Sequence, residues 1–343
     1  MKIAFLMDKL QSIDPAFETT SHLMYECNQR GHNVYFLEPH DIYIRRNAVV
    51  ARMYNITVSA GMAMPEYWQA LIECLKKEDR IFETVTELDA LFLRKDPPLN
   101  YQSLEFLAPV GHKVFMINRT DGQIIANSKL YALNFPNSIP ETHVSRDPKR
   151  LIRIIEGFGG AMVVKPLQGF GGEGIIKVST RDRENLISLI HYYTRASHPY
   201  EERVPIMVQE YLEAAREGDV RILMLDGEIL GAMRRVPKEG EFRANVKAGG
   251  TVMPHTITPQ QQFICATIKD RLSQDGLHFV GIDVIGDKLI EINCVSPGGI
   301  PRINMLDGVK LETKVIDFVE RKVRERAAEL DASTGEARAQ NVP

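Results

Sequence analysis

The chain has 343 residues, of which 44% are hydrophobic and 25% are charged, and its 42 Lys and Arg residues against 45 Asp and Glu residues give a net charge of −3. At about 150 residues per domain, this composition predicts a soluble globular protein of two to three domains and excludes a disordered chain. It also excludes a strongly basic protein that coats nucleic acid, and no apolar run approaches the roughly 20 residues of a membrane span.

Two further features predict a cytoplasmic protein. The first residues, MKIAFLMDKL, become charged too soon for a signal peptide and are better explained as a buried strand. The cysteines are Cys27, Cys74, Cys265 and Cys294. Because they form no CxxC pair and have no histidine at metal-ligand spacing, we expect free buried thiols rather than disulfides or a zinc site.

The N-terminal third of the chain shows an α/β pattern. An apolar strand over 3–7, a helix over 17–30 and a strand over 33–37 predict a parallel sheet. Further strands are expected over 48–58, 90–93 and 113–117, and a helix over 102–108. The first strand–helix junction, MDKLQSIDPAFET, contains no glycine, so we expect a Rossmann-like fold without the dinucleotide site of a G-x-G-x-x-G turn.

After residue 120 the pattern changes to short strands separated by helices. The turns Asp226-Gly227 and Gly286-Asp287 are hairpin signals within it. Strands are predicted over 141–144, 162–165, 175–178, 207–211, 220–225, 229–234, 279–285 and 288–292. Helices are predicted over 127–135, 148–157, 183–193, 259–275 and 311–330. The residues from 332 to the end are small and polar, and we expect them to fray.

A glycine-rich loop follows the predicted strand over 162–165. Four glycines within residues 169–174 give a loop whose backbone N–H groups can turn toward one anion, and Lys165 adds a fixed positive charge beside it. Together they suit the polyphosphate of ATP, although the spacing is not that of a P-loop and no Ser or Thr follows to bind Mg²⁺. A flexible hairpin turn is the alternative interpretation.

Polar residues interrupt the apolar hairpin over 279–293. Glu291 and Asn293 share one face of a strand, and Asp283 on the partner strand can lie beside them. Two carboxylates and one amide oxygen form a hard-oxygen site that suits Mg²⁺, with phosphates completing its coordination. The alternative is a solvated hairpin face, which the flanking Ile and Val residues disfavour.

Three cationic segments are further candidates. Arg94 and Lys95 follow a predicted strand, where open α/β sheets bind ligands, and could hold a substrate carboxylate. Arg221 lies in an otherwise apolar strand, so it needs a phosphate, a carboxylate or the nearby Asp219 as its partner if it is buried. Residues 240–250 are cationic and bounded by glycines, as in a lid. An exposed charged loop is the alternative for the first and last of these segments.

In six motifs taken in order, the chain resembles the bacterial glutathione synthetase family of ATP-grasp ligases. They are R-K-D-P-P, N-x-K-L, K-P-L-x-G-x-G-G, G-D-x-R, R-x-N-x-x-x-G-G and D-x-I-G-D-x-L-x-E-I-N, and the match is collinear over residues 1–325. The resemblance implies an α/β protein with an ATP-grasp fold. Its implied parts are a Rossmann-like N-terminal domain over 1–122, a central ATP-grasp subdomain over 123–204, a C-terminal subdomain over 205–330 and a disordered tail over 331–343.

The resemblance also implies roles for residues at the matching positions. Lys129 and Lys165 would contact ATP phosphates, covered by the loop that contains Gly169, Gly171 and Gly172. Adenine would be held by Gln209, Glu210, Tyr211 and Leu212. The Mg²⁺ ligands would be Asp283, Glu291 and Asn293, with Mn²⁺ as a possible substitute. Arg221, Arg243 and Asn245 would act at the acyl phosphate, and the substrate would contact Arg94, Lys95, Ser296, Gly298 and Gly299.

The implied reaction is ATP-dependent ligation of γ-glutamylcysteine to glycine through an acyl phosphate, with neither nucleic acid nor membrane as a partner. It needs no side-chain nucleophile, because the protein aligns the reactants and neutralises charge. Family members are commonly homo-oligomers. A non-catalytic nucleotide-binding protein is disfavoured, because the phosphate lysine Lys165 and the implied metal ligands are all present.

One segment departs from the family pattern. After E-I-N the family usually continues S-P-T-x-I-R-E, whereas this chain continues Ser296-Pro-Gly-Gly-Ile-Pro-Arg302. A glycine replaces the threonine, a proline precedes the arginine, and the acid is lost. Because the resemblance places this segment near the peptide substrate, a ligase for another γ-glutamyl or amino-acid substrate is the alternative function.

Overall fold

The computed structural model describes residues 1–10, 14–56, 58–77, 80–196, 202–246 and 249–339. Its contacts divide the chain into two compact units. Unit 1 comprises Met1–Ile124, Leu272–Phe279 and Val295–Pro343, and unit 2 comprises Ile125–Arg271 and Val280–Cys294. Unit 1 therefore contains the predicted N-terminal domain, and unit 2 contains most of the predicted central and C-terminal subdomains.

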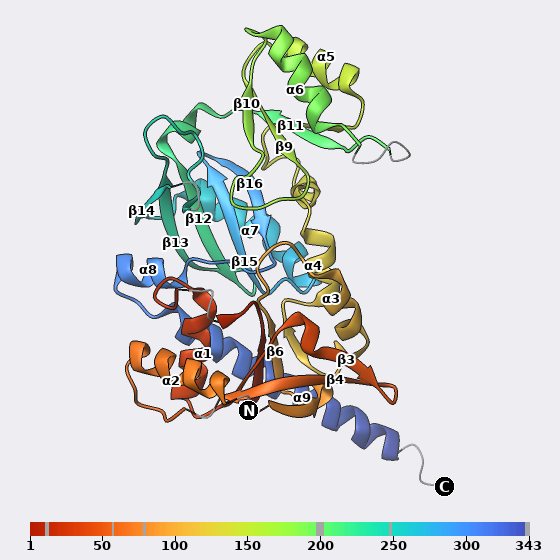
Figure 1. Cartoon of the computed structure of the whole chain (residues 1–343), viewed down its shortest axis with the longest axis vertical. Helices are drawn as coiled ribbons and strands as arrows, with labels where there is room; N and C mark the ends of the chain where they lie inside the picture. The colour runs from red at the N-terminus through yellow and green to blue at the C-terminus, as the bar shows by residue number, and fades with distance from the viewer. Residues whose placement is uncertain (11–13, 57, 78–79, 197–201, 247–248, 340–343) are drawn as a thin grey trace. The chain divides into compact units, whose positions relative to one another are not determined.

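Unit 1 is built on a mixed sheet with a parallel centre (Figure 1). The strand order is β3-β4-β2-β1-β6-β7, with β5 paired to β4. β1 pairs in parallel with β2 and β6, and β6 with β7, which confirms the predicted parallel sheet. The strands are β1 (Lys2–Leu6), β2 (Asn33–Leu37), β3 (Ile42–Arg45), β4 (Ala48–Ile56), β5 (Arg80–Thr84), β6 (Ala90–Leu93) and β7 (Phe115–Ile117).

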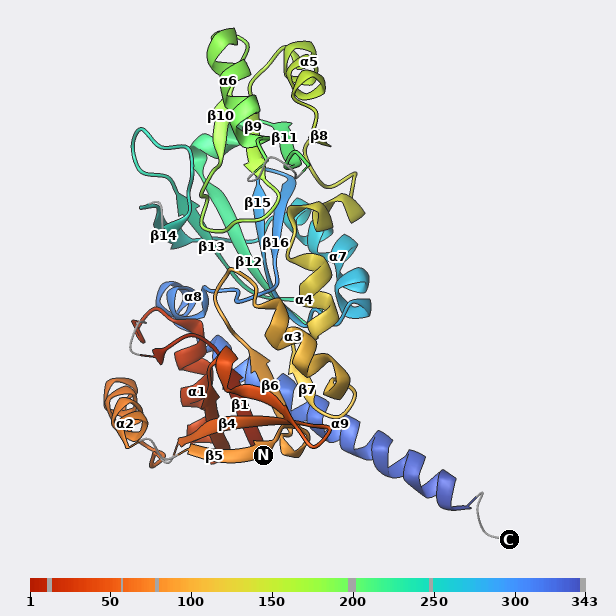
Figure 2. The ribbon, with the colours of Figure 1, turned by 45° about the vertical axis from the view of Figure 1, so that its right-hand side comes forward.

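Helix α1 (Thr19–Gln29) joins the first two strands as the sequence predicts. Leu23 and Cys27 are fully buried on its inner side, and Gly31 after its end has a left-handed φ of +74°. In Figure 2, α1 lies beside α9 (Leu311–Ala339), and Arg30 bonds Glu320 of that helix at 3.2 Å. The other helices wholly within unit 1 are α2 (Met64–Lys76), α3 (Tyr101–Leu107) and α8 (Ile300–Asp307). Neither α2 nor α8 is among the helices that the sequence predicts.

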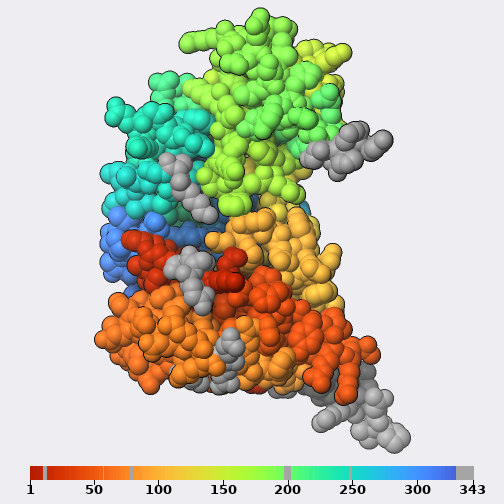
Figure 3. All heavy atoms as spheres, in the orientation of Figure 1, coloured from red at the N-terminus to blue at the C-terminus, as the bar shows by residue number. Residues whose placement is uncertain are grey.

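Unit 2 contains two antiparallel sheets. The four-stranded sheet has the order β10-β9-β11-β8 and packs against α5 (Pro148–Phe158) and α6 (Arg183–Tyr193) around a common apolar core. In the space-filling view, the residues of α5 and α6, yellow-green to green, lie at the top of the face shown (Figure 3). The strands of this sheet are β8 (Thr142–Ser145), β9 (Met162–Pro166), β10 (Ile176–Val178) and β11 (Ile206–Glu210).

The five-stranded sheet of unit 2 has the order β14-β13-β12-β15-β16. Its strands are β12 (Asp219–Leu225), β13 (Glu228–Val236), β14 (Thr251–Pro254), β15 (Phe279–Ile285) and β16 (Lys288–Asn293), and α7 (Pro259–Gln274) is the predicted long helix. The predicted helix over 127–135 is instead a 3₁₀ helix over Lys129–Asn134, which follows the short α4 (Thr120–Ala126).

The C-terminal helix and the cysteines also bear on the sequence predictions. The backbone of α9 continues past residue 330, into the segment for which a tail was predicted. Cys27, Cys265 and Cys294 are buried and Cys74 is partly exposed, and none of these four residues, all of which the structure describes, is in a disulfide. Across the part of the chain that the structure describes, none of the helices combines the length and hydrophobicity needed to traverse a bilayer.

Within unit 1, Asn118 connects two distant segments. Its side-chain amide donates to the Phe279 carbonyl at 2.7 Å and accepts from the Phe279 N–H at 2.7 Å, and the residue is 3% exposed. We expect Asn118→Ala to lower the free energy of unfolding by about 2–4 kcal/mol, because two buried backbone groups lose their partners. Urea denaturation followed by circular dichroism measures this free energy. A loss below about 0.5 kcal/mol would contradict a stabilising role for the Asn118 hydrogen bonds.

Candidate active site

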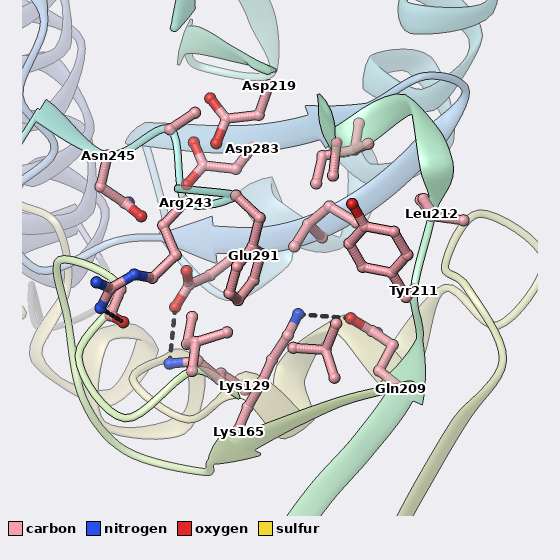
Figure 4. Close-up of a pocket in the computed structure, with 18 of the residues that line it drawn as sticks. Lys129, Lys165, Gln209, Tyr211, Leu212, Asp219, Arg243, Asn245, Asp283 and Glu291 are labelled. Carbon is pink, nitrogen blue, oxygen red and sulfur yellow. Dashed lines mark hydrogen bonds and ion pairs between the residues drawn. The ribbon is translucent and has the colours of Figure 1, made fainter. Parts of the chain in front are cut away.

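A deep pocket lies within unit 2 (Figure 4). Its empty space, part of which is open solvent, is about 810 Å³. Both sheets of the unit supply lining residues, together with the glycine-rich loop and the segment around Arg243. The pocket contains most of the residues predicted to hold the nucleotide and two of the three predicted to hold the metal.

Two lysines approach the pocket from the side of the four-stranded sheet. Lys165 on β9 is 6% exposed, and its Nζ donates to Gln209 Oε1 on β11 at 2.6 Å. Burial lowers the pKa of Lys165 to about 8, and the neighbouring Lys129 adds to the effect while Glu291 and Asp283 oppose it. Lys129 donates to the Gly169 carbonyl at 3.1 Å and pairs with Glu291 at 3.1 Å. The pocket therefore holds two cations suited to phosphate oxygens.

Next to Lys165, the pocket is lined by the segment that contains Tyr211. Residues 209–212, predicted to hold adenine, all line it. Tyr211 is 8% exposed and packs with Val163 and Ala215, and Lys177 Nζ lies 3.3 Å from the centre of its ring. A flat apolar surface beside polar groups suits a purine base.

The glycine-rich loop touches the segment over 241–245. Arg243 donates to the Gly172 carbonyl at 3.1 Å and also pairs with Glu241 at 2.6 Å. Gly172 has a φ of +79°, and a Cβ at this position would lie 2.6 Å from Asn245 Oδ1. Gly172 lines the pocket, whereas Gly169 and Gly171 belong to the same loop without lining it. The two loops thus meet through a contact that only glycine accommodates.

The predicted metal ligands lie on one hairpin. Asp283 on β15 is directly opposite Glu291 on β16, and Asn293 Nδ2 donates to Asp283 Oδ2 at 3.3 Å. A bulge between Asp283 and Val284 shifts the pairing by one residue, so that Ile290 is extra in its strand. Three oxygen-bearing side chains are therefore brought together, as the alternation of the sequence predicted.

Two arginines hold Asp283. Arg221 on β12 contacts both of its oxygens, with Nε at 2.5 Å and Nη2 at 3.0 Å, and Arg235 Nη2 lies at 3.0 Å. Arg235 also bonds Asp219 at 2.6 and 2.8 Å. Burial opposes ionisation of Asp283, but Arg221 and Arg235 outweigh it and keep the pKa of this carboxyl below its usual range.

Arg235 is not among the site residues that the sequence predicts. Its side chain is 5% exposed and has two carboxylate partners, of which Asp219 is its direct neighbour across the β12–β13 pair. The Arg234-Arg235 pair in an otherwise apolar strand was the available signal, since a buried cation needs a carboxylate or phosphate partner. Arg221 is predicted to need such a partner, and the structure pairs it with Asp283.

The predicted substrate residues lie in unit 1, where Arg94 joins three segments. It is 3% exposed, and its guanidinium donates to Thr20 Oγ1 at 3.1 Å and to the Pro297 carbonyl at 3.1 Å. Ser296 Oγ in turn donates to the Arg94 carbonyl at 3.3 Å. Lys95 pairs with Asp8 at 3.0 Å. Arg94 therefore holds the segment around Ser296 in place.

The segment that departs from the family pattern begins helix α8. Thr19 Oγ1 accepts hydrogen bonds from the N–H groups of Gly299 at 3.1 Å and Ile300 at 3.3 Å, so a side chain from α1 caps this helix. Pro301 in the first turn has no N–H to donate. A Cβ at Gly298 would meet no atom within 4 Å, so this position has open space around it.

Comparison with known proteins identifies the family. The model for the prokaryotic glutathione synthetase N-terminal domain matches residues 1–123, and the model for the ATP-grasp domain of the same family matches residues 128–308. The chain belongs to the prokaryotic glutathione synthetase family. It is an ATP-binding enzyme of the ATP-grasp fold that forms C–N bonds between small molecules, as the sequence predicted.

Relatives match over nearly their whole length. The glutathione synthetase of Synechocystis sp. is 40% identical over 94% of this chain and 100% of its own, and that of Brucella melitensis biotype 1 is 34% identical over 93% and 98%. Among solved structures, a Chryseobacterium gregarium RiPP-associated ATP-grasp ligase in complex with ADP has a TM-score of 0.64 at 14% identity, covering 94% of this chain and 97% of its own. The ATP-grasp ligase PsnB has a TM-score of 0.59 at 15% identity, covering 94% and 99%. These structures share the fold.

The contact between the two loops predicts the effect of a methyl group at Gly172. We expect Gly172→Ala to weaken nucleotide binding about tenfold, because its Cβ would strain the backbone and displace Asn245. Gly157→Ala in α5 is the matched control, since a Cβ there meets no atom within 4 Å, and its affinity should not change. Isothermal titration calorimetry measures both, and an unchanged Gly172→Ala variant would refute the contact.

The lowered pKa of Lys165 predicts that ATP binding takes up a proton. At pH 8.5 the amine is deprotonated in more than half of the molecules, because its pKa is about 8, and phosphate oxygens favour the charged form. The affinity for ATP should therefore fall as the pH rises above 8. Calorimetry at pH 8.5 in two buffers of different protonation enthalpy should give different apparent enthalpies. In Lys165→Arg, whose guanidinium stays protonated, the difference should vanish.

Proposed function

We propose that this chain is a glutathione synthetase that joins γ-glutamylcysteine to glycine. The observation that carries the proposal is one pocket with Lys129 and Lys165 on one side and the Asp283–Glu291 pair on the other. Cations suit the phosphates of ATP, and paired carboxylates suit a divalent cation bound to those phosphates. Full-length relatives named glutathione synthetase support the choice of substrates.

The donor set suits Mg²⁺, which prefers hard oxygen ligands, and it would also take Mn²⁺. Asp283 stays ionised, Glu291 faces it across the strand pair, and Asn293 adds an amide oxygen. Asp283, Glu291 and Asn293 would hold the ion, which when bound supplies positive charge that neutralises the phosphates. The other residues of the pocket then bind and orient the nucleotide.

In the proposed reaction, the C-terminal carboxylate of γ-glutamylcysteine attacks the γ-phosphorus of ATP, and ADP leaves. The amine of glycine attacks the resulting acyl phosphate, loses a proton, and expels phosphate as the peptide bond forms. Lys129, Lys165 and Arg221 would stabilise charge on the transferred group. Arg243 and Asn245 would keep the two loops together and exclude water from the acyl phosphate.

We place substrate recognition on unit 1, at Arg94, Lys95, Ser296, Gly298 and Gly299. The hydrogen bonds of Arg94 to Thr20 and Pro297 support a role in holding this segment. We also propose a homo-oligomer in the cytoplasm, with neither nucleic acid nor membrane as a partner. The lack of a disulfide among the four cysteines, all of which the structure describes, supports a reducing compartment.

The test is phosphate release from the full-length protein with Mg²⁺-ATP, γ-glutamylcysteine and glycine, omitting each in turn. We expect release to need all three and glutathione to appear by mass spectrometry. ATP binding without turnover would indicate another acceptor, for which the altered segment over 296–302 is the reason. No ATP binding would contradict the ligase assignment.

A variant pair tests the proposed metal ligands. Glu291→Gln should lower kcat about 100-fold, because the amide keeps the shape of the side chain but removes the charge. Asp287→Asn, in the exposed turn of the same hairpin, makes the same chemical change and should leave kcat unaltered. Equal losses in the two variants would count against a metal role for Glu291.

A further inference from the structure

Both carboxylates proposed to bind the metal are in ion pairs with cations proposed to bind the phosphoryl group. Arg221 contacts both oxygens of Asp283, and Lys129 lies 3.1 Å from Glu291 (Figure 4 shows the second pair). Asn293 donates its amide to Asp283, so its side chain also points to the same carboxylate. The metal ligands are therefore engaged by the protein itself.

These ion pairs balance in charge. The cations Lys129, Arg221 and Arg235 match the carboxylates of Asp219, Asp283 and Glu291 one for one, and Lys165 adds a further positive charge nearby. A lone divalent cation entering this set would displace two cations from their carboxylates and bring nothing negative in their place. A metal that arrives with a nucleotide brings phosphate oxygens that can take up the displaced cations.

The two arginines differ in what holds them. Arg235 is bound at 2.6 and 2.8 Å to Asp219 as well as at 3.0 Å to Asp283. It therefore keeps a carboxylate partner if Asp283 turns toward another ligand. Lys129 lines the pocket, and the side chain of Arg221 is 11% exposed against 5% for Arg235, so Arg221 and Lys129 are the two cations that can exchange partners.

We propose that Arg221 and Lys129 block the metal site until a nucleotide binds, and then exchange Asp283 and Glu291 for phosphate oxygens. This proposal rests on the proposed function, because it takes these carboxylates as metal ligands and the pocket as the nucleotide site. Metal and nucleotide then bind with strong positive coupling, and each raises the affinity for the other by the same factor. The enzyme is also protected from taking up a metal ion without ATP.

The experiment measures Mn²⁺ binding to the full-length protein by electron paramagnetic resonance, with and without a non-hydrolysable ATP analogue. The wild-type protein should bind Mn²⁺ weakly alone and at least about tenfold more tightly with the analogue. Arg221→Met and Lys129→Met should each raise the affinity for Mn²⁺ alone about tenfold, and so reduce the coupling. Arg234→Met is the matched control, because Arg234 bonds the carbonyl and carboxylate of Glu217 rather than a proposed metal ligand. Its Mn²⁺ affinity should match that of the wild type.

The outcomes separate this proposal from the proposed function. If the wild-type protein binds no Mn²⁺ even with the analogue, the metal site itself is wrong. If it does bind, but neither variant gains affinity for Mn²⁺ alone, the exchange of partners is refuted and the metal site stands. Circular dichroism checks that each variant folds, and the Lys129 variant keeps the test decisive if loss of Arg221 prevents folding.

Discussion

Asp219, Arg235, Asp283 and Glu291 form a charged cluster in unit 2. Its arrangement depends on a register shift of one residue, which occurs in each of two hairpins of the five-stranded sheet. In the β12–β13 hairpin, a bulge beside Leu223 places Asp219 opposite Arg235 rather than Arg234. In the β15–β16 hairpin, a bulge beside Asp283 places this residue opposite Glu291 rather than Ile290. Since side chains alternate between the two faces of a strand, pairing without the bulges would set an apolar side chain opposite Asp283. The bulges thus determine which charges meet.

Burying this many charges is costly unless each has a partner with good geometry. The side chains of Asp219, Arg235 and Asp283 are at most 12% exposed. Contacts of 2.6 to 3.0 Å connect Arg235 to both carboxylates. Removing one member would leave another charge uncompensated, at a cost of about 3–5 kcal/mol. The same low-polarity setting strengthens any electrostatic contact made there, which suits a site that handles phosphates.

The sequence predicts the parts of the site that depend on local pattern. Glu291 and Asn293 share a face because they are two residues apart, and Lys165 precedes four glycines, so both were found without knowledge of the fold. The pairing of Arg221 with Asp283 was not found, because it depends on β12 lying next to β15, whose residues are far apart in the chain. The contacts of the buried Arg94 guanidinium with Thr20 and Pro297 could not be predicted, because only the folded chain brings these residues near. Helix α8 was missed because its cap, Thr19, comes from another helix.

The division of unit 1 into three stretches of chain has a consequence for synthesis on the ribosome. Its N-terminal stretch emerges first, but α1 is covered by α9, in which Val315 and Val319 are fully buried. Unit 2 ends at Cys294, before the last stretch of unit 1 begins. Its synthesis is therefore complete before that of unit 1. During synthesis, the apolar face of α1 therefore stays exposed until α9, at the end of the chain, has left the ribosome. A fragment that stops at residue 124 would carry the same uncovered face permanently, so the two units cannot be separated by a single cut.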